Sequence, residues 1–327
     1  MAMQNGKPAP LGEIRSATGS RRHALALMLG AWRWLPRALA AADTGAPVRL
    51  AISESLVVDV NLNDARAAML IWLKRMMVDL NAVIEFNPKV FDTTEEILRR
   101  ARSGQLDVVA LNVVEYHQIA DVLDPSQIVS ESGPAGQEQY ILLAKSGSGT
   151  QHLGDLRGRR LTMLKAPKMC VATAWLSTIL DAGNFGPSEQ FFGSVTTDVK
   201  PSRVVLPVFF GQADACVTTR RGFDTMCELN PQVAKDLTAI ASSPAMVLCF
   251  YVFHKNYRGL SRESFAKVYS SLRTSAAGRQ LATLFQFDGL TVRDVSCLAS
   301  ALGVLETADR VRSRPGGGIR KGSQNED

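Results

Sequence analysis

The chain has 327 residues, of which 46% are hydrophobic, and a formal net charge of +6. This length exceeds one compact core and suits about two domains. Residues 1–42 carry five more basic than acidic side chains and residues 309–327 two more, which leaves residues 43–308 with one net negative charge. Because no basic patch with interleaved aromatic residues lies in this middle region, nucleic acid is not expected as a partner.

The first 42 residues have the layout of an export signal. A basic lead ends at Arg21 and Arg22, the apolar run Ala24–Ala31 follows, and small residues offer a cleavage site near residues 40–42. The paired arginines resemble a twin-arginine signal, although the usual aromatic residue and leucine do not follow them. We therefore expect a periplasmic protein. The alternative is a cytoplasmic protein with a disordered or surface-lying basic start, since the apolar run is too short for a membrane span.

The first half of the middle region alternates strand-like and helix-like segments. Val48–Ile52 predicts a strand, and apolar residues at helical spacing predict a helix over Asn63–Leu80. A capping residue ahead of acidic residues at Asp92–Glu96 predicts a second helix, which runs to Ser103. Further strands are expected at 83–86 and 107–111 and a helix at about 114–122. This order predicts an α/β fold with a mainly parallel sheet.

A second α/β series begins with an expected strand at 140–145. The apolar stretch Ala245–Phe253 predicts another strand. Asn230-Pro231 is expected to end a helix that includes residues 223–229. Helices are expected near 170–182, at 223–229, 262–272, 275–285 and 294–308. Residues 309–327 are expected to form a disordered tail.

Five scattered cysteines give neither a zinc pattern nor a disulfide framework. Cys216 and Cys249 lie in apolar runs and are expected to pack as small hydrophobic residues. No metal or other cofactor is expected.

Two short phrases repeat each other, Gly104-Gln-Leu-Asp107 and Gly211-Gln-Ala-Asp214. In each, the glycine is expected to end a helix in the left-handed conformation, and the aspartate then opens an apolar strand. In an open α/β sheet such strands end at a crevice where ligands bind. The repeat therefore predicts two lobes that share a cleft, and its alternative interpretation is a pair of ordinary helix-to-strand turns.

The phrase Leu153-Gly-Asp-Leu-Arg-Gly-Arg-Arg-Leu-Thr162, with Val208–Ala215 further on, resembles the substrate-binding proteins of phosphate, phosphite and phosphonate ABC importers. These belong to the type 2 periplasmic-binding-protein superfamily, and the similarity spans roughly residues 48–305. It implies two Rossmann-like lobes joined by a two-strand hinge. Lobe 1 would comprise residues 46–139 plus 246–308, and lobe 2 residues 140–245.

In that family a Ser-Thr-Ser-type run at the start of a lobe-2 helix holds an oxyanion with hydroxyl and backbone N–H groups, as helix N-termini can. This chain has Lys168-Met-Cys170-Val-Ala-Thr173 there, which lacks most of the hydroxyls. Lys168 would supply charge instead, or it is a solvated lysine. Cys170 has a lowered pKa at a helix start, or it is a packed thiol.

Other candidate ligand residues follow strand ends. The resemblance places Tyr116 on a ligand-contacting loop, although the glycine and proline usual there are absent. Asp214 would line or brace the cleft, or cap its own turn, and Arg220 would fork onto a carboxylate or phosphate. Glu54 would repel an anion unless a cation compensates. The remaining candidates are Ser53, Ser55, Asn112 and Thr218.

The expected function is an exported receptor that closes two lobes on a small polar or anionic ligand. A monomer is expected, and the partner is an ABC permease or a membrane sensor kinase. The main alternative is an enzyme on the same fold that uses Cys170 or Lys168, but no nucleophile or phosphate-loop motif is present and histidines are sparse. A purely structural or interaction domain is the third interpretation.

Overall fold

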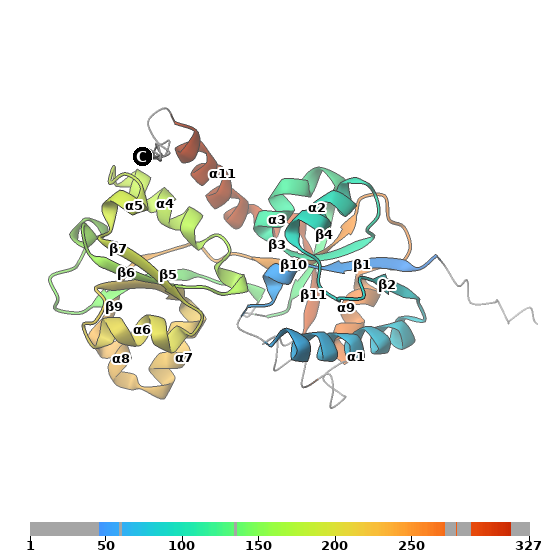
Figure 1. Cartoon of the computed structure of the whole chain (residues 1–327), viewed down its shortest axis with the longest axis horizontal. Coiled ribbons are helices and arrows are strands. Elements are labelled where there is room, and N and C mark those ends of the chain that lie inside the picture. Colours follow the sequence, from blue (N-terminus) through green and yellow to red (C-terminus); the bar gives the residue numbers. More distant parts are fainter. Residues whose placement is uncertain (1–45, 59–60, 134–135, 272–278, 280–288, 315–327) are drawn as a thin grey trace, which may run out of the picture. The chain divides into compact units, whose positions relative to one another are not determined.

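The computed structural model describes residues 46–58, 61–133, 136–271, 279 and 289–314 (Figure 1). The expected export signal lies outside these described residues, as do nearly all of the expected helix at 275–285 and most of the expected tail. The described strands form one six-stranded and one five-stranded sheet. We call the six-stranded sheet with its helices lobe 1 and the five-stranded sheet with its helices lobe 2.

The sheet of lobe 1 mixes parallel and antiparallel strands. Strand β1 is parallel to β2 and β3, whereas β10 runs antiparallel to both β3 and β4, and β11 antiparallel to β4. In spatial order its strands are β11 (Leu290–Asp294), β4 (Leu123–Glu131), β10 (Cys249–His254), β3 (Val108–Asn112), β1 (Val48–Ile52) and β2 (Ile84–Phe86).

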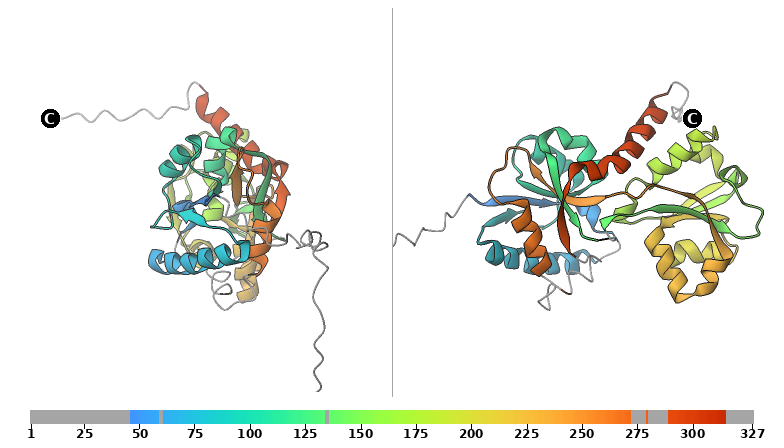
Figure 2. Two further views of the ribbon diagram at one scale, coloured as in Figure 1. Left: turned by 90° about the vertical axis from the view of Figure 1, so that its right-hand side faces the viewer. Right: turned by 180° about the vertical axis from the view of Figure 1, so that it is seen from behind.

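Helices cover both faces of this sheet. Helices α1 (Leu62–Leu80) and α9 (Arg262–Ser271) lie on one face, with α2 (Thr94–Arg102) and α3 (Val113–Ile119) on the other (Figures 1 and 2). The expected helix over 63–80 is confirmed. Asn61 caps the start of α1 by accepting hydrogen bonds from two backbone N–H groups. The fully buried side chains Trp72, Leu73 and Met76 of α1 hold the helix to the core.

The sheet of lobe 2 has the parallel strands β6, β7 and β8, with β5 antiparallel to β8 and β9. Its spatial order is β7 (Ser194–Asp198), β6 (Arg160–Leu164), β8 (Ala215–Thr219), β5 (Tyr140–Lys145) and β9 (Leu237–Ser242). Helices α4 (Ala172–Ala182) and α5 (Ser188–Phe191) lie on one face, and α6 (Pro201–Phe209), α7 (Arg220–Leu229) and α8 (Pro231–Asp236) on the other (Figure 1). Because both faces are covered, Tyr140–Ala144 of β5 are fully buried, as the near-continuous apolar run indicates.

Two paired segments join the lobes. The chain leaves β4 for β5 and later returns from β9 to β10, and Glu138 and Met246 of these segments exchange two backbone hydrogen bonds of 2.8 Å. The hydroxyl of Ser243 accepts a hydrogen bond from the backbone N–H of Tyr140 at 2.8 Å. The expected α/β fold with a two-strand hinge is confirmed.

The expected C-terminal boundary is wrong. Helix α11 (Ala299–Ser313) continues through residues 309–313, which were expected to belong to a disordered tail. It buries Ala301, Val304, Leu305 and Ala308, the spacing of one helix face, and Arg310 and Arg312 suit its carboxyl end. Val311 continues this face at helical spacing and is half-buried, but the other residues of the final turn are polar, which gives only a weak hydrophobic signal.

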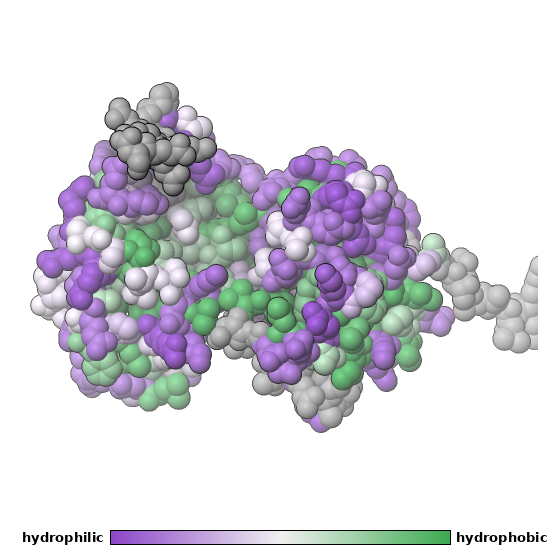
Figure 3. All heavy atoms as spheres, viewed as in Figure 1, coloured by the Kyte–Doolittle hydropathy of each residue, from purple (hydrophilic) through white to green (hydrophobic). Residues whose placement is uncertain are grey.

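The described surface is mixed. Hydrophilic residues prevail over the helices of lobe 1 on the face shown in Figure 3, and the exposed large hydrophobic side chains include Ile71 and Val78 of α1. Within the described part of the chain, no helix has both the length and the apolar character to cross a membrane.

Candidate functional site

One edge of the lobe 1 sheet gathers candidate residues from strands that are distant in sequence. Parallel strands β1 and β3 both end there, so Ser53 and Asn112 follow their carboxyl ends. Strand β10 begins at the same edge because Cys249 pairs with Asn112, and β4 ends there because Ser130 pairs with Phe250. This is the edge at which open α/β sheets bind ligands.

At this edge a buried carboxylate gathers donors from three loops. Glu115, only 2% exposed, accepts hydrogen bonds from the hydroxyls of Ser53 (2.5 Å), Ser55 (3.1 Å) and Thr94 (2.6 Å) and from the backbone N–H of Asn112 (3.0 Å). We call these five residues the Glu115 cluster. Both oxygens of the carboxylate are satisfied, so an internal anion already holds the donors that an external oxyanion would need.

The Glu115 cluster includes three of the expected site residues but is organised by one that the sequence analysis missed. Asn112 caps α3, and its side chain accepts hydrogen bonds from the backbone N–H groups of Val114 and Glu115. In return, the side chain of Glu115 accepts a hydrogen bond from the backbone N–H of Asn112, which completes a capping box. The Asn-x-x-Glu spacing was the available signal. Glu54, between the two serines, is exposed.

A second cluster centres on an ion pair between the lobes. Lys168, in the short helical turn Pro167–Met169, donates from Nζ to Oε2 of Glu131 at 2.5 Å. The Glu131 side chain is 9% exposed and that of Lys168 27%. Oε1 of Glu131 is buried and has no hydrogen-bond partner among the described residues. Of the two expected states of Lys168, the solvated lysine is therefore wrong.

Glu138, on the first of the two joining segments, lies close to the same lysine. Burial raises the pKa of Glu138, while the N–H of Gln139 and the charge of Lys168 oppose that rise. Glu131, Glu138 and Lys168 thus place two acids and one cation beside the two joining segments.

The start of α4 presents backbone donors without a side-chain cap. Its N-cap, Val171, makes no side-chain hydrogen bond, and Thr173 in the first turn is exposed. The backbone N–H of Val171 donates to the hydroxyl of buried Tyr140 at 3.4 Å. Lys168 therefore lies just before the N-cap of α4 along the chain. The anion site expected at 168–173 stays a prediction.

At the carboxyl end of β8, Thr219 caps α7 by accepting a hydrogen bond from the N–H of Gly222 at 3.1 Å. The Oγ1 of fully buried Thr218 has no partner among the described residues. The backbone N–H of Arg220 donates to the carbonyl of Gln139, at 2.7 Å, on the first joining segment. Thr218 and Arg220 thus lie beside that segment.

The family model for the periplasmic substrate-binding protein of phosphonate ABC transporters matches residues 61–296. The chain belongs to this family. No curated protein matches it.

Solved structures agree in fold. A binding protein of a phosphonate ABC transporter from Pseudomonas aeruginosa is 14% identical, covers 81% of this chain and 87% of its own, and has a TM-score of 0.52. A Xanthomonas citri protein solved bound to ATP is 13% identical over 82% of this chain and 98% of its own, with a TM-score of 0.54. PhnD1 from Prochlorococcus marinus, in complex with methylphosphonate, is 13% identical over the same shares, with a TM-score of 0.52. The type 2 periplasmic-binding-protein fold is confirmed.

Tyr116 has a packing role in this family member. Its side chain is 5% exposed, and its ring meets that of Phe250 edge-on at a centroid distance of 5.4 Å. Burial, followed by the charge of Asp124, raises the pKa of its hydroxyl. The structure does not bring this side chain into the Glu115 cluster.

Asp214 lies at the opposite end of its strand from Thr219. It opens β8 and accepts hydrogen bonds from the backbone N–H (2.8 Å) and Nε (3.1 Å) of Arg160, the first residue of β6. Of its two expected roles, these contacts favour the structural one.

The repeated phrase has a repeated geometry. Gly104 and Gly211 have φ angles of +68° and +74°, as expected for left-handed caps. Asp107 binds the backbone N–H of Arg49 at 2.8 Å and its Nη2 at 2.7 Å, and so repeats the Asp214–Arg160 contact at the start of β1. Both turns therefore fasten the amino edges of the sheets, and the expectation that Asp214 lines the ligand cleft is corrected.

These pairs predict an acid-sensitive stability. Burial alone would raise the pKa of Asp107, but hydrogen bonds from Arg49 outweigh it and lower the pKa. A lowered folded-state pKa gives stability that is present above the unfolded pKa of about 3.9 and is lost as pH falls through the folded value. Asp107→Asn should therefore show a shallower loss of unfolding free energy below about pH 4 in urea titrations. Asp224→Asn, at an exposed aspartate without a described ion pair, is the control, and equal acid slopes in the wild type and Asp107→Asn would contradict this account.

Cys170 is a packed thiol, the second of its two expected states. Burial, and then the neighbouring Cys249, raises the pKa of Cys170 well above its ordinary value. Burial raises the pKa of Cys249 to about 12. Neither thiol is suited to nucleophilic catalysis near neutral pH, because the thiolate is the reactive form.

Brief maleimide treatment of the native protein should therefore modify Cys227 on α7 before Cys170, Cys216 and Cys249, because burial raises the pKa of these three thiols further than that of Cys227. Peptide mass spectrometry resolves the order, and urea should abolish the difference. Rapid native labelling of Cys170 would restore the enzyme alternative.

Within the described residues, no group of three or more histidine, cysteine, aspartate or glutamate side chains could hold a metal ion.

Proposed function

We propose that this member of the family binds a small oxyanion chiefly through lobe 2, with Lys168 as its charged contact. Periplasmic substrate-binding proteins of this family bind small molecules and deliver them to an ABC permease. The placement of Lys168 at the start of α4 is the observation that carries the proposal. Lys168 lies in the turn Pro167–Met169, just before the N-cap Val171 of α4. A cation and the first-turn N–H groups of a helix that come from one short stretch of chain favour a phosphonate-like or other oxyanionic ligand.

Lobe 1 would make a different contribution from lobe 2. Because Glu115 takes up the hydroxyls of Ser53 and Ser55, these donors support the loop rather than the ligand. The ligand would instead displace Glu131 from Lys168, with Thr173 and Arg220 as further contacts. Asn112 and Thr218 would stabilise the edges of the site, and Glu54 would disfavour highly charged anions.

The remaining parts of the proposal concern partners and export. The protein would act as a monomer and without a cofactor, and it would be exported by a twin-arginine-like signal. The two sheets and the joining segments support the division into lobe 1 (46–139 plus 246–308) and lobe 2 (140–245). A sensor kinase in place of the permease is the alternative partner, because the departure from the hydroxyl run at 168–173 favours a different cargo.

The test is calorimetric titration of the protein with methylphosphonate, inorganic phosphate and sulfate. Lys168→Met should weaken the oxyanion that binds best by at least about tenfold. Lys165→Met, which removes an exposed lysine three residues earlier, is the matched control. Equal affinities in the two variants would overturn the role of Lys168. Failure of every oxyanion to bind the wild type would overturn the ligand class, and Cys170→Ser should leave affinity unchanged.

A further inference from the structure

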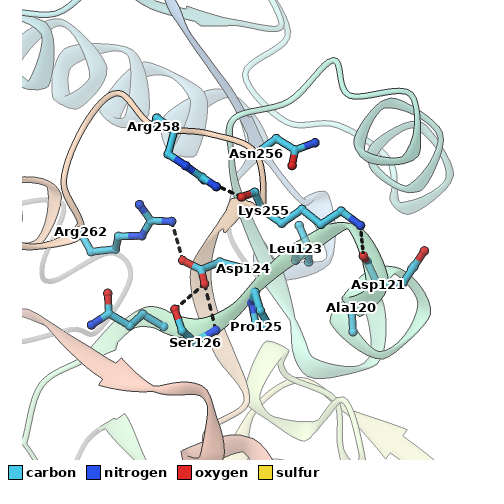
Figure 4. Close-up of a pocket in the computed structure, with 11 residues that line it drawn as sticks. Ala120, Asp121, Leu123, Asp124, Pro125, Ser126, Lys255, Asn256, Arg258 and Arg262 are labelled. Atoms are coloured by element: carbon cyan, nitrogen blue, oxygen red, sulfur yellow. Dashed lines mark hydrogen bonds and ion pairs between the residues drawn. The ribbon is translucent and has the colours of Figure 1, made fainter.

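A pocket in lobe 1 lies away from the strand ends described above. It has a volume of about 710 Å³ and is lined by residues 120–127, at the start of β4, and by the segment from β10 to α9 (Figure 4). Strands β4 and β10 pair from Ser130–Phe250 at the ligand-binding edge to Leu123–His254 at the other end. The pocket therefore lies at the opposite edge of the sheet from the Glu115 cluster, and its volume is within the range of small-molecule sites.

The wall of the pocket is formed by an irregularity in β4. The register between β4 and β10 shifts between Val252 and His254, so residues 124–127 have no partner in β10, although Gln127 still pairs with Asp294 of β11. Pro125, which has no N–H to donate, lies in this interruption. Asp124 stabilises the irregular backbone by accepting hydrogen bonds from the N–H (2.9 Å) and hydroxyl (2.6 Å) of Ser126.

The carboxylate of Asp124, in this wall, is already paired with a cation. Nη2 of Arg262 donates to Oδ2 of Asp124 at 2.5 Å, and the Arg262 guanidinium lies 4.4 Å from the ring centre of Phe253. Although burial opposes ionisation, the hydrogen bonds from Ser126 and Arg262 lower the pKa of Asp124. Asp124 is therefore charged, but Ser126 and Arg262 already bind it. Its charge offsets that of Arg262 and leaves the charges of Lys255 and Arg258.

Arg258 lines the pocket with an exposed side chain, and part of its guanidinium has no described hydrogen-bond partner. Its Nη1 donates to the backbone carbonyls of Lys255 (2.6 Å) and Tyr257 (3.0 Å), which fixes the side chain. No described residue accepts a hydrogen bond from Nε or Nη2, the edge of the guanidinium that binds carboxylates and phosphates through two parallel hydrogen bonds. Figure 4 shows Arg258 extending toward Lys255 and Arg262 toward Asp124.

Lys255 adds a second cation. Its Nζ donates to the backbone carbonyl of Asp121 at 2.7 Å, so its charge is not paired with the Asp121 carboxylate through this contact. The pocket thus holds Lys255, Arg258 and Arg262 against Asp121 and the engaged Asp124, and its net charge is positive.

We propose that this pocket is a second binding site, which takes a small organic oxyanion on the Nε–Nη2 edge of Arg258 with Lys255 beside it. The ligand is a carboxylate or a phosphate of a size that fits about 710 Å³. Because β4 and β10 lead from the pocket to the two joining segments, a ligand here would stabilise the pair of strands that carries the hinge.

The test titrates the full chain with citrate and with inorganic phosphate. Arg258→Gln should weaken binding of the better probe by at least about tenfold, and Arg258→Lys should weaken it as well because it keeps the charge but loses the two-point contact. Arg66→Gln is the matched control, since Arg66 also lies in lobe 1 and donates to a backbone carbonyl. Each titration is made in the Lys168→Met background, which removes the charged contact of the proposed solute site and so leaves the pocket as the site under test.

The outcomes separate the two sites. In the Lys168→Met background, binding that Arg258→Gln removes and that Arg66→Gln leaves within about twofold supports the pocket. Preference for citrate or for phosphate then assigns the ligand to carboxylates or phosphates. Binding that survives Arg258→Gln in this background, or no binding of either probe up to about 10 mM, overturns the proposal.

Discussion

Glu115→Ala is expected to lower the free energy of unfolding by about 3 to 5 kcal/mol, because it leaves four buried or partly buried donors without this acceptor. Each unsatisfied buried group costs about 1 to 3 kcal/mol, and water that enters the vacated space recovers part of the sum. Urea denaturation in the absence of ligand measures the change.

Two variants separate the carboxylate from side-chain volume and from surface charge. Glu115→Gln keeps the volume and one oxygen, so it should cost about half as much as Glu115→Ala. Glu228→Ala removes an exposed acid of α7 and should leave stability unchanged. Comparable losses in Glu115→Ala and Glu228→Ala would show that the four hydrogen bonds contribute nothing specific.

The same variant tests whether Glu115 acts as an internal anion. Once the Glu115 carboxylate is gone, the hydroxyls of Ser53, Ser55 and Thr94 can donate hydrogen bonds to a formate ion that takes its place. Formate should therefore raise the Tm of Glu115→Ala and have a much smaller effect on the wild type. An equal shift in both proteins would argue that the donors turn elsewhere when Glu115 is removed.

The elements that could be predicted from the sequence are those with a clear pattern of apolar residues. Helix α1 has apolar residues at helical spacing, and β3, β5 and β8 are near-continuous apolar runs. Strand β7 was missed because it lies at a sheet edge and four of its five residues are exposed. Strand β4 was missed because Asp124–Gln127 resemble a turn, and these residues do lose their pairing with β10.

The candidate site was predictable only where its residues follow strands. Ser53, Ser55 and Asn112 could be named in this way, and Lys168 stood out against the hydroxyl run of the resembling family. Glu131 could not be named, because it lies 37 residues from Lys168. Glu115 had a local signal in its capping-box spacing with Asn112, but its contact with Ser53, 62 residues away, could not be foreseen. Register and the crossing of the chain between sheets decide such contacts, and neither leaves a local period in the sequence.

The Lys168–Glu131 pair gives the other large expected effect. Lys168→Met should lower the free energy of unfolding by about 2 to 4 kcal/mol, since it leaves the buried Glu131 carboxylate without its cation. The estimate is below that for a fully buried pair because Lys168 is 27% exposed. Urea denaturation of the ligand-free protein gives the value.

A double-mutant cycle distinguishes the pair from the individual side chains. If the penalty in Lys168→Met comes from a stranded charge, adding Glu131→Leu should restore most of the lost stability, because a well-packed apolar pair avoids the desolvation of both groups. Additive losses would mean instead that each side chain contributes through separate packing. The same cycle bears on ligand release, because an oxyanion that displaces Glu131 from Lys168 must itself offset that desolvation, and a neutral residue at position 131 should therefore tighten oxyanion binding while Lys168 is retained.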